Sequence, residues 1–434
     1  MTEVKVAVIG AGSYVFGLSA LKQALLDHRL DGIELALMDV DAEALGAMAG
    51  VGRRMAKDMG LGARITAHTE RGPAMEGASF VLCAAAVQLA RCYQVDCEIA
   101  LRFCPGHIIT EFGGVQGISY SLRQIALIDD IAADMKRLCP GAWLLNACNP
   151  LPRVCQAAHE AGVRTAGFCS SAMSIFGRMW RWFGGGDERE YPWPEGQDAY
   201  ALTYAGLNHF CWLLAARDRR TGADLLPQLP QRLKDCNYAA YHPLSMDLFE
   251  RTGYLPLPHD GHLQDFVEPT AKSRPLHEIQ HGTAEERAER LAMLRDVGDR
   301  RRDLADLPVQ TSWERPMDFV AAMAFGRSAA FHGLNLINDG QIADLPRNVF
   351  VETPCLVTGD GPVPERIELP AAVLPYARRT ARVTDTIVRA ARGRKRSLVH
   401  EAVELDPTIL DTKAGLAAID ACMKAHAALL PPYD

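Results

Sequence analysis

The chain has 434 residues, a formal net charge of -7 at pH 7 and a sequence pI near 6.0. A chain of this length predicts two or three domains rather than one. Hydrophobic residues make up 48% and charged residues 23%, as in soluble globular proteins with a large core. The acidic balance argues against nucleic acid or an acidic membrane as a partner.

The first residues, "MTEVKVAVIG", carry neither the basic region nor the extended apolar run of a secretory signal. No run of 18 apolar residues follows, so the sequence predicts no membrane span. The twelve cysteines lack CxxC spacing, which indicates reduced thiols in a cytoplasmic protein rather than a disulfide framework.

Short apolar segments alternate with helical patterns along roughly the first 170 residues. This alternation predicts an α/β fold with a Rossmann-type, doubly wound parallel sheet. Glycine, proline and charge cluster at 184–196, which predicts a boundary between an NAD-binding domain, 1–190, and a mixed α+β catalytic and oligomerisation domain, 191–434. The expected strands span 4–10, 33–41, 63–69, 79–86, 142–150 and 162–170, and the expected helices include 14–28, 120–141 and 411–430.

The segment "KVAVIGAGSYVFG" is typical of a dinucleotide-binding turn. Gly10 and Gly12 follow the first strand and open the first helix, where the backbone can approach a pyrophosphate. Val15 stands where a third glycine is usual, and Gly17 lies two residues further on. Asp39 ends the second strand, where a carboxylate would accept ribose hydroxyls and repel a 2′-phosphate, so NAD is favoured over NADP. The expected cofactor contacts are Gly10, Gly12, Ser13, Asp39 and Asn146.

Several polar residues follow later strands. Asn149 lies at the end of the strand at 142–150, and Cys169 at the end of the next one, at the edge where open sheets bind ligands. Asn208 and His209 lie between apolar runs in the second half. Each of these residues alone is commonly found packed in a core, but together they predict an open divalent-metal site with positions left for substrate oxygens.

These residues belong to a wider resemblance that covers nearly the whole chain. The glycine turn, Asp39, "CNPLPRV", Cys169 and "GLNHF" resemble family 4 of the glycoside hydrolases, which are NAD-dependent, usually manganese-dependent glycosidases on a lactate/malate dehydrogenase-like scaffold. The most specific match is "GLNLINDGQIADLPRNVFVETPCLV" at 333–357, which is close to the family signature. "ELDPTIL" fits the family's C-terminal segment, and the related NAD-dependent sulfoquinovosidases are a similar group.

The resemblance implies an unusual glycosidase mechanism. NAD⁺ oxidises C3 of the sugar, a base removes the acidified C2 proton, the C1 substituent is eliminated, water adds, and the hydride returns. By position, Cys169 and His209 would ligate a divalent metal, Mn²⁺ in most of the family. Asn149 and Asn208 would contact the sugar hydroxyls.

The chain departs from the family pattern after the metal-ligating cysteine. Family members commonly carry histidine, aspartate or asparagine at this position, and the residue there often takes part in proton transfer, whereas this chain has Ser170. Serine is a poor general acid unless a neighbour relays the proton. The loop "EFGGVQGISYSLRQI" adds Glu111 and Arg123 as expected substrate contacts.

The base at C2 has three candidates in "TGYLPLPHDGHLQDF". Tyr254 matches the family's usual tyrosine and is the first choice. His259 and His262 are alternatives because imidazole titrates near neutral pH. A surface or packing role is an equal alternative for each of the three.

Substrate and assembly follow less directly. Arg178 and Arg181 alternate with aromatic residues in "SIFGRMWRWFGGG", a pattern that suits an anionic sugar such as a uronate, sulfonate or phosphate, or simply a solvated helix face. The family implies an α-glycoside substrate and a homodimer or homotetramer. Two alternatives stay open: an NAD-dependent dehydrogenase of a hydroxy acid or sugar with net NADH release, and a non-catalytic NAD-sensing protein.

Overall fold

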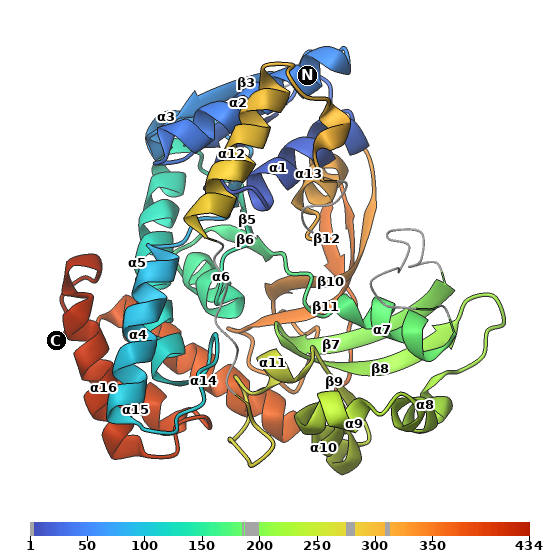
Figure 1. The fold of residues 1–434 in the computed structure, drawn as a ribbon, viewed down its shortest axis with the longest axis vertical. Helices are drawn as coiled ribbons and strands as arrows, with labels where there is room; N and C mark the ends of the chain where they lie inside the picture. The colour runs from blue at the N-terminus through green and yellow to red at the C-terminus, as the bar shows by residue number, and fades with distance from the viewer. Residues whose placement is uncertain (1–3, 185, 187–198, 275–282, 309–312) are drawn as a thin grey trace.

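One sheet runs through both halves of the chain in the computed structural model, which describes residues 4–184, 186, 199–274, 283–308 and 313–434 (Figure 1). Within these residues the sheet has 12 strands in the order β3-β2-β1-β4-β5-β6-β10-β11-β7-β8-β9, with β12 paired to β11. The strands are β1 Lys5–Ile9, β2 Glu34–Met38, β3 Arg64–His68, β4 Phe80–Cys83, β5 Trp143–Asn146, β6 Arg164–Gly167, β7 Tyr200–Leu207, β8 Phe210–Asp218, β9 Leu255–Leu257, β10 Ala329–Ile337, β11 Phe350–Thr358 and β12 Gly361–Pro364.

The first six strands are parallel and confirm the predicted Rossmann-type sheet. Alternate residues of β1 face opposite sides, so Val6 and Val8 join one buried cluster while Ala7 and Ile9 join the other. Helices cover both faces, as a doubly wound sheet requires. They are α1 Phe16–Lys22, continued by the π-helix η1 Gln23–Asp27, α2 Ala42–Asp58, α3 Arg71–Met75, α4 Leu89–Phe103, α5 Gly114–Leu138 and α6 Leu151–Glu160, whereas α7 Ser174–Trp182 packs in a separate cluster with β7 and β8.

The second half extends this sheet with antiparallel strands. β10 joins β6 through the pair Asn335 and Gly167, and β11 continues to β7. The mixed α+β character predicted for this half is therefore confirmed. Its helices are α8 Leu229–Asp235, α9 Tyr238–Tyr241, α10 Pro243–Thr252, α11 Asp260–Leu263, α12 Ala284–Gly298, α13 Pro316–Ala324, α14 Leu374–Gly393, α15 Arg396–Leu405 and α16 Thr412–Ala425, with short 3-10 turns η4 Leu226–Gln228, η5 Leu304–Asp306 and η6 Ala427–Leu429.

Helices from the end of the chain return to the first half. α12 packs on α2 and α13 on η1, whereas α14 packs on α5 and α6, and α16 on α4 and α5 (Figure 1). Val388 and Ile419 enter the buried cluster on one face of the parallel sheet, and Phe319 enters the cluster on the other. Both faces are thus completed by the second half. The predicted boundary near residue 190 falls among residues outside the described part and stays a prediction.

Gly17 explains the missing third glycine of the dinucleotide motif. A Cβ at Gly17 would lie 2.0 Å from the carbonyl oxygen of Ala11, so only glycine lets α1 pack directly on the turn. Val15, at the usual position, is exposed and touches nothing that would demand glycine. The helices of the described part include none that is both long and apolar enough to cross a membrane.

Candidate active site at the carboxyl edge of the sheet

Cys169 and His209 meet at the carboxyl edge of the parallel strands. Cys169 lies two residues beyond β6, and His209 occupies the turn between β7 and β8. The Cys169 Sγ and the His209 Nε2 are 3.1 Å apart. His209 adopts a left-handed φ of 62°, a conformation that is costly for a residue other than glycine and is often found at functional sites.

Burial keeps both side chains neutral. Burial raises the pKa of the Cys169 thiol well above its usual range, with help from the negative charges of Glu314 and Glu352. Burial, with the nearby His262, lowers the pKa of His209 well below its usual range. A neutral thiol and a neutral imidazole in contact are ready to accept a cation, which would displace the thiol proton.

An acid and a second histidine lie on the other side of His209. Glu111, His209 and His262 bring ligand atoms within 4.8 Å of one another, so this trio is also able to bind a metal ion. The His262 Nδ1 lies 3.5 Å from the Glu111 carboxylate and 3.8 Å from that of Asp265. The ring of Phe112 packs against His209 with 4.8 Å between the ring centroids.

The environment raises the pKa values of both this acid and this histidine. Burial raises the pKa of Glu111 to about 7, although His262 and a hydrogen bond from Asn149 oppose the shift. Burial alone would lower the pKa of His262, but Asp265 and then Glu111 outweigh it, so the pKa is raised. The contacts among Glu111, His262 and Asp265 therefore influence the protonation of both groups.

The loop that carries Glu111 is held by Asp265, which lies just after α11. The Asp265 Oδ1 accepts hydrogen bonds from the backbone N–H groups of Phe112 and Gly113, at 2.7 and 2.9 Å. A Cβ at Gly113 would lie 2.6 Å from the carbonyl oxygen of Asp265, so this close approach requires glycine. The Gly-Gly of "EFGG" thus fixes Glu111 against α11.

Ser170 is bonded to an acid from a distant part of the chain. The Ser170 backbone N–H and its hydroxyl both donate to the Glu314 Oε1, at 3.0 and 2.8 Å. Glu314 and Cys169 line the same small cavity, together with Phe331 and His332. The serine therefore has the acidic neighbour that proton transfer at this position needs.

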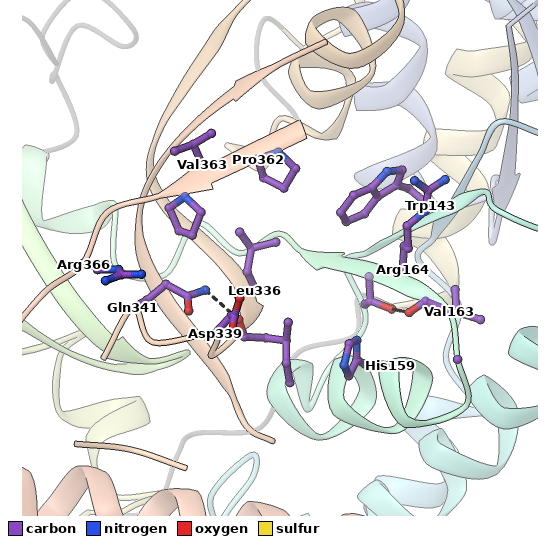
Figure 2. Close-up of a pocket in the computed structure, with 14 residues that line it drawn as sticks. Trp143, His159, Val163, Arg164, Leu336, Asp339, Gln341, Pro362, Val363 and Arg366 are labelled. Carbon is purple, nitrogen blue, oxygen red and sulfur yellow. Dashed lines mark hydrogen bonds between the residues drawn. The ribbon is translucent and has the colours of Figure 1, made fainter. Parts of the chain in front are cut away.

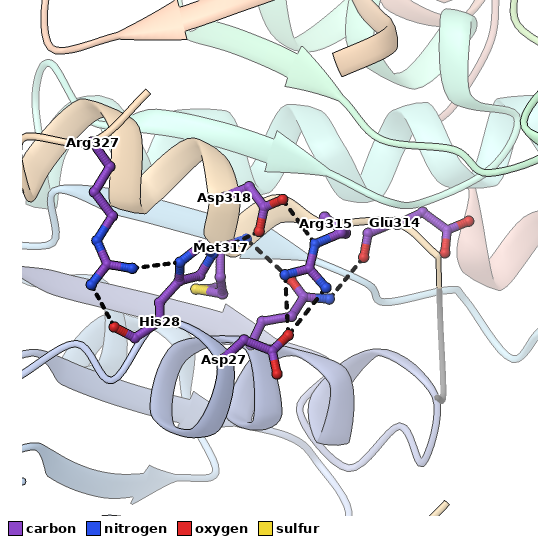
Figure 3. Close-up of polar contacts among 8 residues, drawn as sticks. Asp27, His28, Glu314, Arg315, Met317, Asp318 and Arg327 are labelled. Carbon is purple, nitrogen blue, oxygen red and sulfur yellow. Dashed lines mark hydrogen bonds and ion pairs between the residues drawn. The ribbon is translucent and has the colours of Figure 1, made fainter. Parts of the chain in front are cut away.

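The segment that carries Glu314 is fastened to the first helix of the parallel half, as Figure 3 shows. Arg315 bonds both Asp27 and Asp318. His28 bonds Asp318 at 2.6 Å and in turn contacts Arg327. This chain of ion pairs joins η1 to α13 and fixes the backbone next to Glu314.

Asn208 is held by the acid of the sequence signature. Its amide donates to the Glu352 Oε2 at 2.9 Å, and the amide of Asn335 donates to the same oxygen at 3.3 Å. Glu352 is fully buried, and burial raises its pKa to about 7 against the effect of these amides. Asn208 also opposes the rise in the pKa of the Cys169 thiol, so the signature acid holds a neighbour of the Cys169–His209 pair.

The dinucleotide turn brings its predicted residues together. The Asp39 Oδ2 accepts the backbone N–H of Gly12 at 2.8 Å, and Gly10 donates to the end of β2. The Ser13 hydroxyl accepts a hydrogen bond from the N–H of Phe16, the first residue of α1. The side chain of Asn146 is used within the chain: its amide donates to the carbonyl oxygen of Cys148 and so stabilises the end of β5.

Three of the predicted residues lie apart from the cluster. Arg123 is buried on α5 in an ion pair with Asp96 at 2.7 Å, because its helix position faces α4 rather than the sheet edge. Tyr254 packs against the apolar cluster around β8 and α10. His259 caps α11 and stacks 6.2 Å from His262, and burial lowers its pKa to about 3.

Three acids of the site were not predicted. Asp265 carried a weak signal, since it follows His262 in a loop already chosen for its histidines. Glu352 sits within the quoted family signature. No sequence signal indicated Glu314, because its partner Ser170 lies 144 positions earlier in the chain.

A larger cavity lies at the opposite edge of the sheet and contains none of these residues. It has a volume of about 610 Å³ and is lined by the first residues of β5 and β6, Trp143 and Arg164, and by Val363 of β12 (Figure 2). The Arg164 guanidinium lies 5.3 Å from the centre of the Trp143 ring. Its lining offers no thiol and no acid–histidine pair within hydrogen-bonding distance, so the chemistry lies at the carboxyl edge.

Comparison with known families agrees with this geometry. A family model described as family 4 glycosyl hydrolase matches residues 5–183, and the model of its C-terminal domain matches residues 204–409. The chain belongs to family 4 of the glycosyl hydrolases. It is a glycosidase, and the resemblance predicted from its motifs is confirmed.

Individual relatives of this family 4 chain differ in the sugars that their names specify. An α-galactosidase of Bacillus subtilis (strain 168) is 27% identical over 442 residues, which cover 99% of each chain. An α-galacturonidase of the same strain is 24% identical over 407 residues, 86% of this chain and 87% of its own. A solved 6-phospho-α-glucosidase from gut microorganisms, described in complex with NAD and Mn²⁺, has the same fold, with a TM-score of 0.80 at 20% identity over 100% of both chains.

The family 4 donor set in this chain fits a divalent cation. The Cys169 thiol contacts the His209 imidazole, and His209 also has a ligand atom within 4.8 Å of ligand atoms of Glu111 and His262, a mixture of groups that suits a first-row transition metal. The His209 Nδ1 and the Asp265 Oδ2 are buried and have no hydrogen-bond partner among the described residues. The nucleotide fits as well, because Asp39 lies against the glycine turn, where ribose and pyrophosphate must be held side by side.

Proposed function

We propose that this chain hydrolyses α-glycosides by transient oxidation of the sugar, with NAD⁺ and a divalent metal ion as cofactors, and that Mn²⁺ is the preferred metal ion. The observation that carries the proposal is the contact of Cys169 with His209, 3.1 Å apart, at the edge that also carries the dinucleotide turn. An oxidant and a Lewis acid are useful together only when both reach one ring. The relatives named as NAD and Mn²⁺ complexes support the same assignment.

When bound, NAD⁺ supplies reversible oxidation at C3, which acidifies the C2 proton, and the metal supplies Lewis acidity for the C2 and C3 oxygens. The protein holds and orients the reactants. Cys169 and His209 hold the metal, and Asn149 orients a sugar hydroxyl next to Glu111. Asn208 keeps Cys169 in position.

We assign the C2 base to His262 rather than to Tyr254. His262 lies beside Glu111 and 4.4 Å, between ring centroids, from His209, so it faces the same space as the metal ligands. Tyr254 packs in a different apolar cluster. Proton abstraction requires a base within hydrogen-bonding reach of the carbon acid, which favours the histidine.

The proposed glycone carries an anionic group at C6, as a uronate or a 6-phosphate does. Arg178 is 5% exposed, and its guanidinium bonds only the hydroxyls of Tyr238 and Ser174 among the described residues. Its Nε has no hydrogen-bond partner, and no carboxylate pairs with it there. A buried cation without an anion is costly, which supports an anionic ligand as its partner. Arg181 of the same helix is exposed and serves as a control.

The test is hydrolysis of the 4-nitrophenyl α-glycosides of galactose, glucose, galacturonic acid and glucose 6-phosphate, with and without NAD⁺ and Mn²⁺. We expect hydrolysis that requires NAD⁺ without accumulation of NADH, and faster turnover of the two anionic sugars. Arg178→Met should remove that preference and Arg181→Met should keep it. Accumulation of NADH would instead indicate a dehydrogenase, and a preference for neutral sugars would refute the anionic glycone alone.

The base is tested separately by deuterium exchange at C2 in D₂O. His262→Ala should abolish exchange into the sugar, whereas Tyr254→Phe should preserve it. The reverse result would return the role to Tyr254.

A further inference from the structure

We propose that Ser170 and Glu314 form the proton relay that protonates the leaving aglycone and later deprotonates the attacking water. This inference rests on the proposed function. It assigns to Glu314, a residue with no role so far, the supply and uptake of the proton that passes through Ser170.

The contact has the geometry of a relay. The Ser170 hydroxyl donates to the Glu314 Oε1 at 2.8 Å, and the Ser170 backbone N–H donates to the same oxygen at 3.0 Å. Two donors on one oxygen fix the carboxylate relative to the serine. The serine hydroxyl keeps its lone pairs to accept a proton while it donates its own to Glu314.

The pair lies beside a proposed metal ligand. Ser170 directly follows Cys169, whose Sγ contacts His209. Glu314 and Cys169 line one cavity of 170 Å³, which Phe331 and His332 help to enclose. The acid of the pair therefore shares a cavity with the cysteine that is proposed to hold the metal.

The backbone that carries Glu314 is anchored on both sides. The Gln23 side chain donates to the carbonyl oxygen of Glu314 at 2.9 Å and accepts the N–H of Met317 at 3.3 Å. Arg315, the next residue, is paired with Asp27 and Asp318 (Figure 3). A surface acid with an incidental serine contact would need no such anchoring, whereas an acid that moves a proton must be held in place.

The proton balance is simple. When the bond between C1 and the aglycone oxygen breaks, its electron pair goes to that oxygen, which takes the proton of the Ser170 hydroxyl. The protonated carboxyl of Glu314 refills the serine and becomes a carboxylate. When water adds at C1, the water gives its proton to Ser170, and the serine passes its own to Glu314, so the relay is restored.

The experiment compares leaving groups that differ in their need for a proton. The probes are the 4-nitrophenyl and the methyl α-glycosides of the sugar turned over fastest in the panel above, because nitrophenolate departs without protonation and methoxide does not. For Glu314→Gln we expect kcat/KM on the methyl glycoside to fall by roughly 10²- to 10⁴-fold, the usual contribution of general acid catalysis. The nitrophenyl glycoside should lose less than about tenfold. Ser170→Ala should give the same split, and Glu365→Gln, an exposed acid after β12, should change neither.

A second readout follows the proton at C2. With Glu314→Gln in D₂O, elimination of methanol stalls after C2 deprotonation, so recovered methyl glycoside should gain C2 deuterium faster, relative to hydrolysis, than with the wild-type enzyme. Equal losses on both leaving groups with an unchanged exchange ratio would overturn the relay and leave Glu314 a structural residue. Failure of the proposed function would look different, since the wild-type enzyme would then show neither NAD⁺ dependence nor C2 exchange.

Discussion

Two buried clusters of acids on neighbouring elements differ in whether their polar atoms have partners. Around Asp96, every acid oxygen has a partner: Arg123 lies 2.7 Å away, His426 lies 2.9 Å away, and Ser119 donates to it. Around Glu111 and Asp265 there is neither a lysine nor an arginine in hydrogen-bonding contact among the described residues, and buried polar atoms have no partner. The acid of the first cluster is paired within the chain, whereas the second cluster leaves buried polar atoms that the proposed cation and substrate would contact.

The sharpest test of this comparison removes Cys169, the proposed metal ligand that contacts His209 beside the incomplete cluster. Cys169→Ala should lower kcat/KM by at least roughly 10³-fold, because a metal supplies several kcal/mol of transition-state stabilisation. The free energy of unfolding without metal should change by no more than about 1 kcal/mol, as for a small truncation. Enzyme kinetics and urea unfolding measure the two. Cys139→Ala, another buried cysteine, is the control and should keep full activity; an equal loss there would show a general packing effect.

The complementary change breaks the complete cluster. Arg123→Met should reduce the free energy of unfolding by about 3–5 kcal/mol, because it leaves Asp96 buried with one fewer counter-charge. The kcat of the protein that stays folded should be unchanged. Adding Asp96→Asn should recover part of the lost stability. A fall in kcat with normal stability would place Arg123 in the catalytic site, as its sequence position suggested.

Metal binding should stabilise the protein through the incomplete cluster. At a free Mn²⁺ concentration of 100 times Kd, the folded state gains about 2.7 kcal/mol by mass action. Thermal unfolding with and without the ion measures this gain. Cys169→Ala should abolish it, and Arg123→Met should not. Equal stabilisation of both variants would mean that the ion binds elsewhere.

The smallest effect is expected for the acid dependence of stability at Asp318, which is paired with His28 and Arg315. Burial would raise the pKa of Asp318, but the bonds from His28 and Arg315 outweigh it and leave the pKa below the ordinary value of 3.8. Because this pKa is lower in the folded than in the unfolded chain, the Asp318 carboxylate contributes to the free energy of unfolding above about pH 4. This contribution is lost as the pH falls through the folded-state pKa. Urea unfolding between pH 5 and 2.5 should therefore show a shallower acid loss for Asp318→Asn than for the wild-type protein. Parallel curves would contradict the role of this ion pair.

The parallel sheet could be predicted because its information is local. Each strand from β1 to β6 is an apolar run that ends in a turn, and the glycine turn with Asp39 marks the first crossover. The antiparallel half is harder to predict, since the junction of β6 with β10 pairs Gly167 with Asn335, 168 positions later in the chain. No local pattern specifies such a pairing.

The site was predictable where its residues end strands. Cys169 and His209 were assigned from motifs, and they lie in contact. Arg123 was assigned from a motif as well, but helical periodicity turned it toward Asp96. Glu314 could not have been found, because its role depends only on which serine it meets in three dimensions.

The junction between β6 and β10 has a consequence for how the molecule is made. A nascent chain that ends near residue 190 would expose β6 as an open edge, with the helices of both faces still lacking the partners that α12 to α16 later provide. Such an edge invites pairing with another chain. During its synthesis this enzyme is therefore prone to aggregate through the β6 edge, until about the last hundred residues have left the ribosome and packed against the first half.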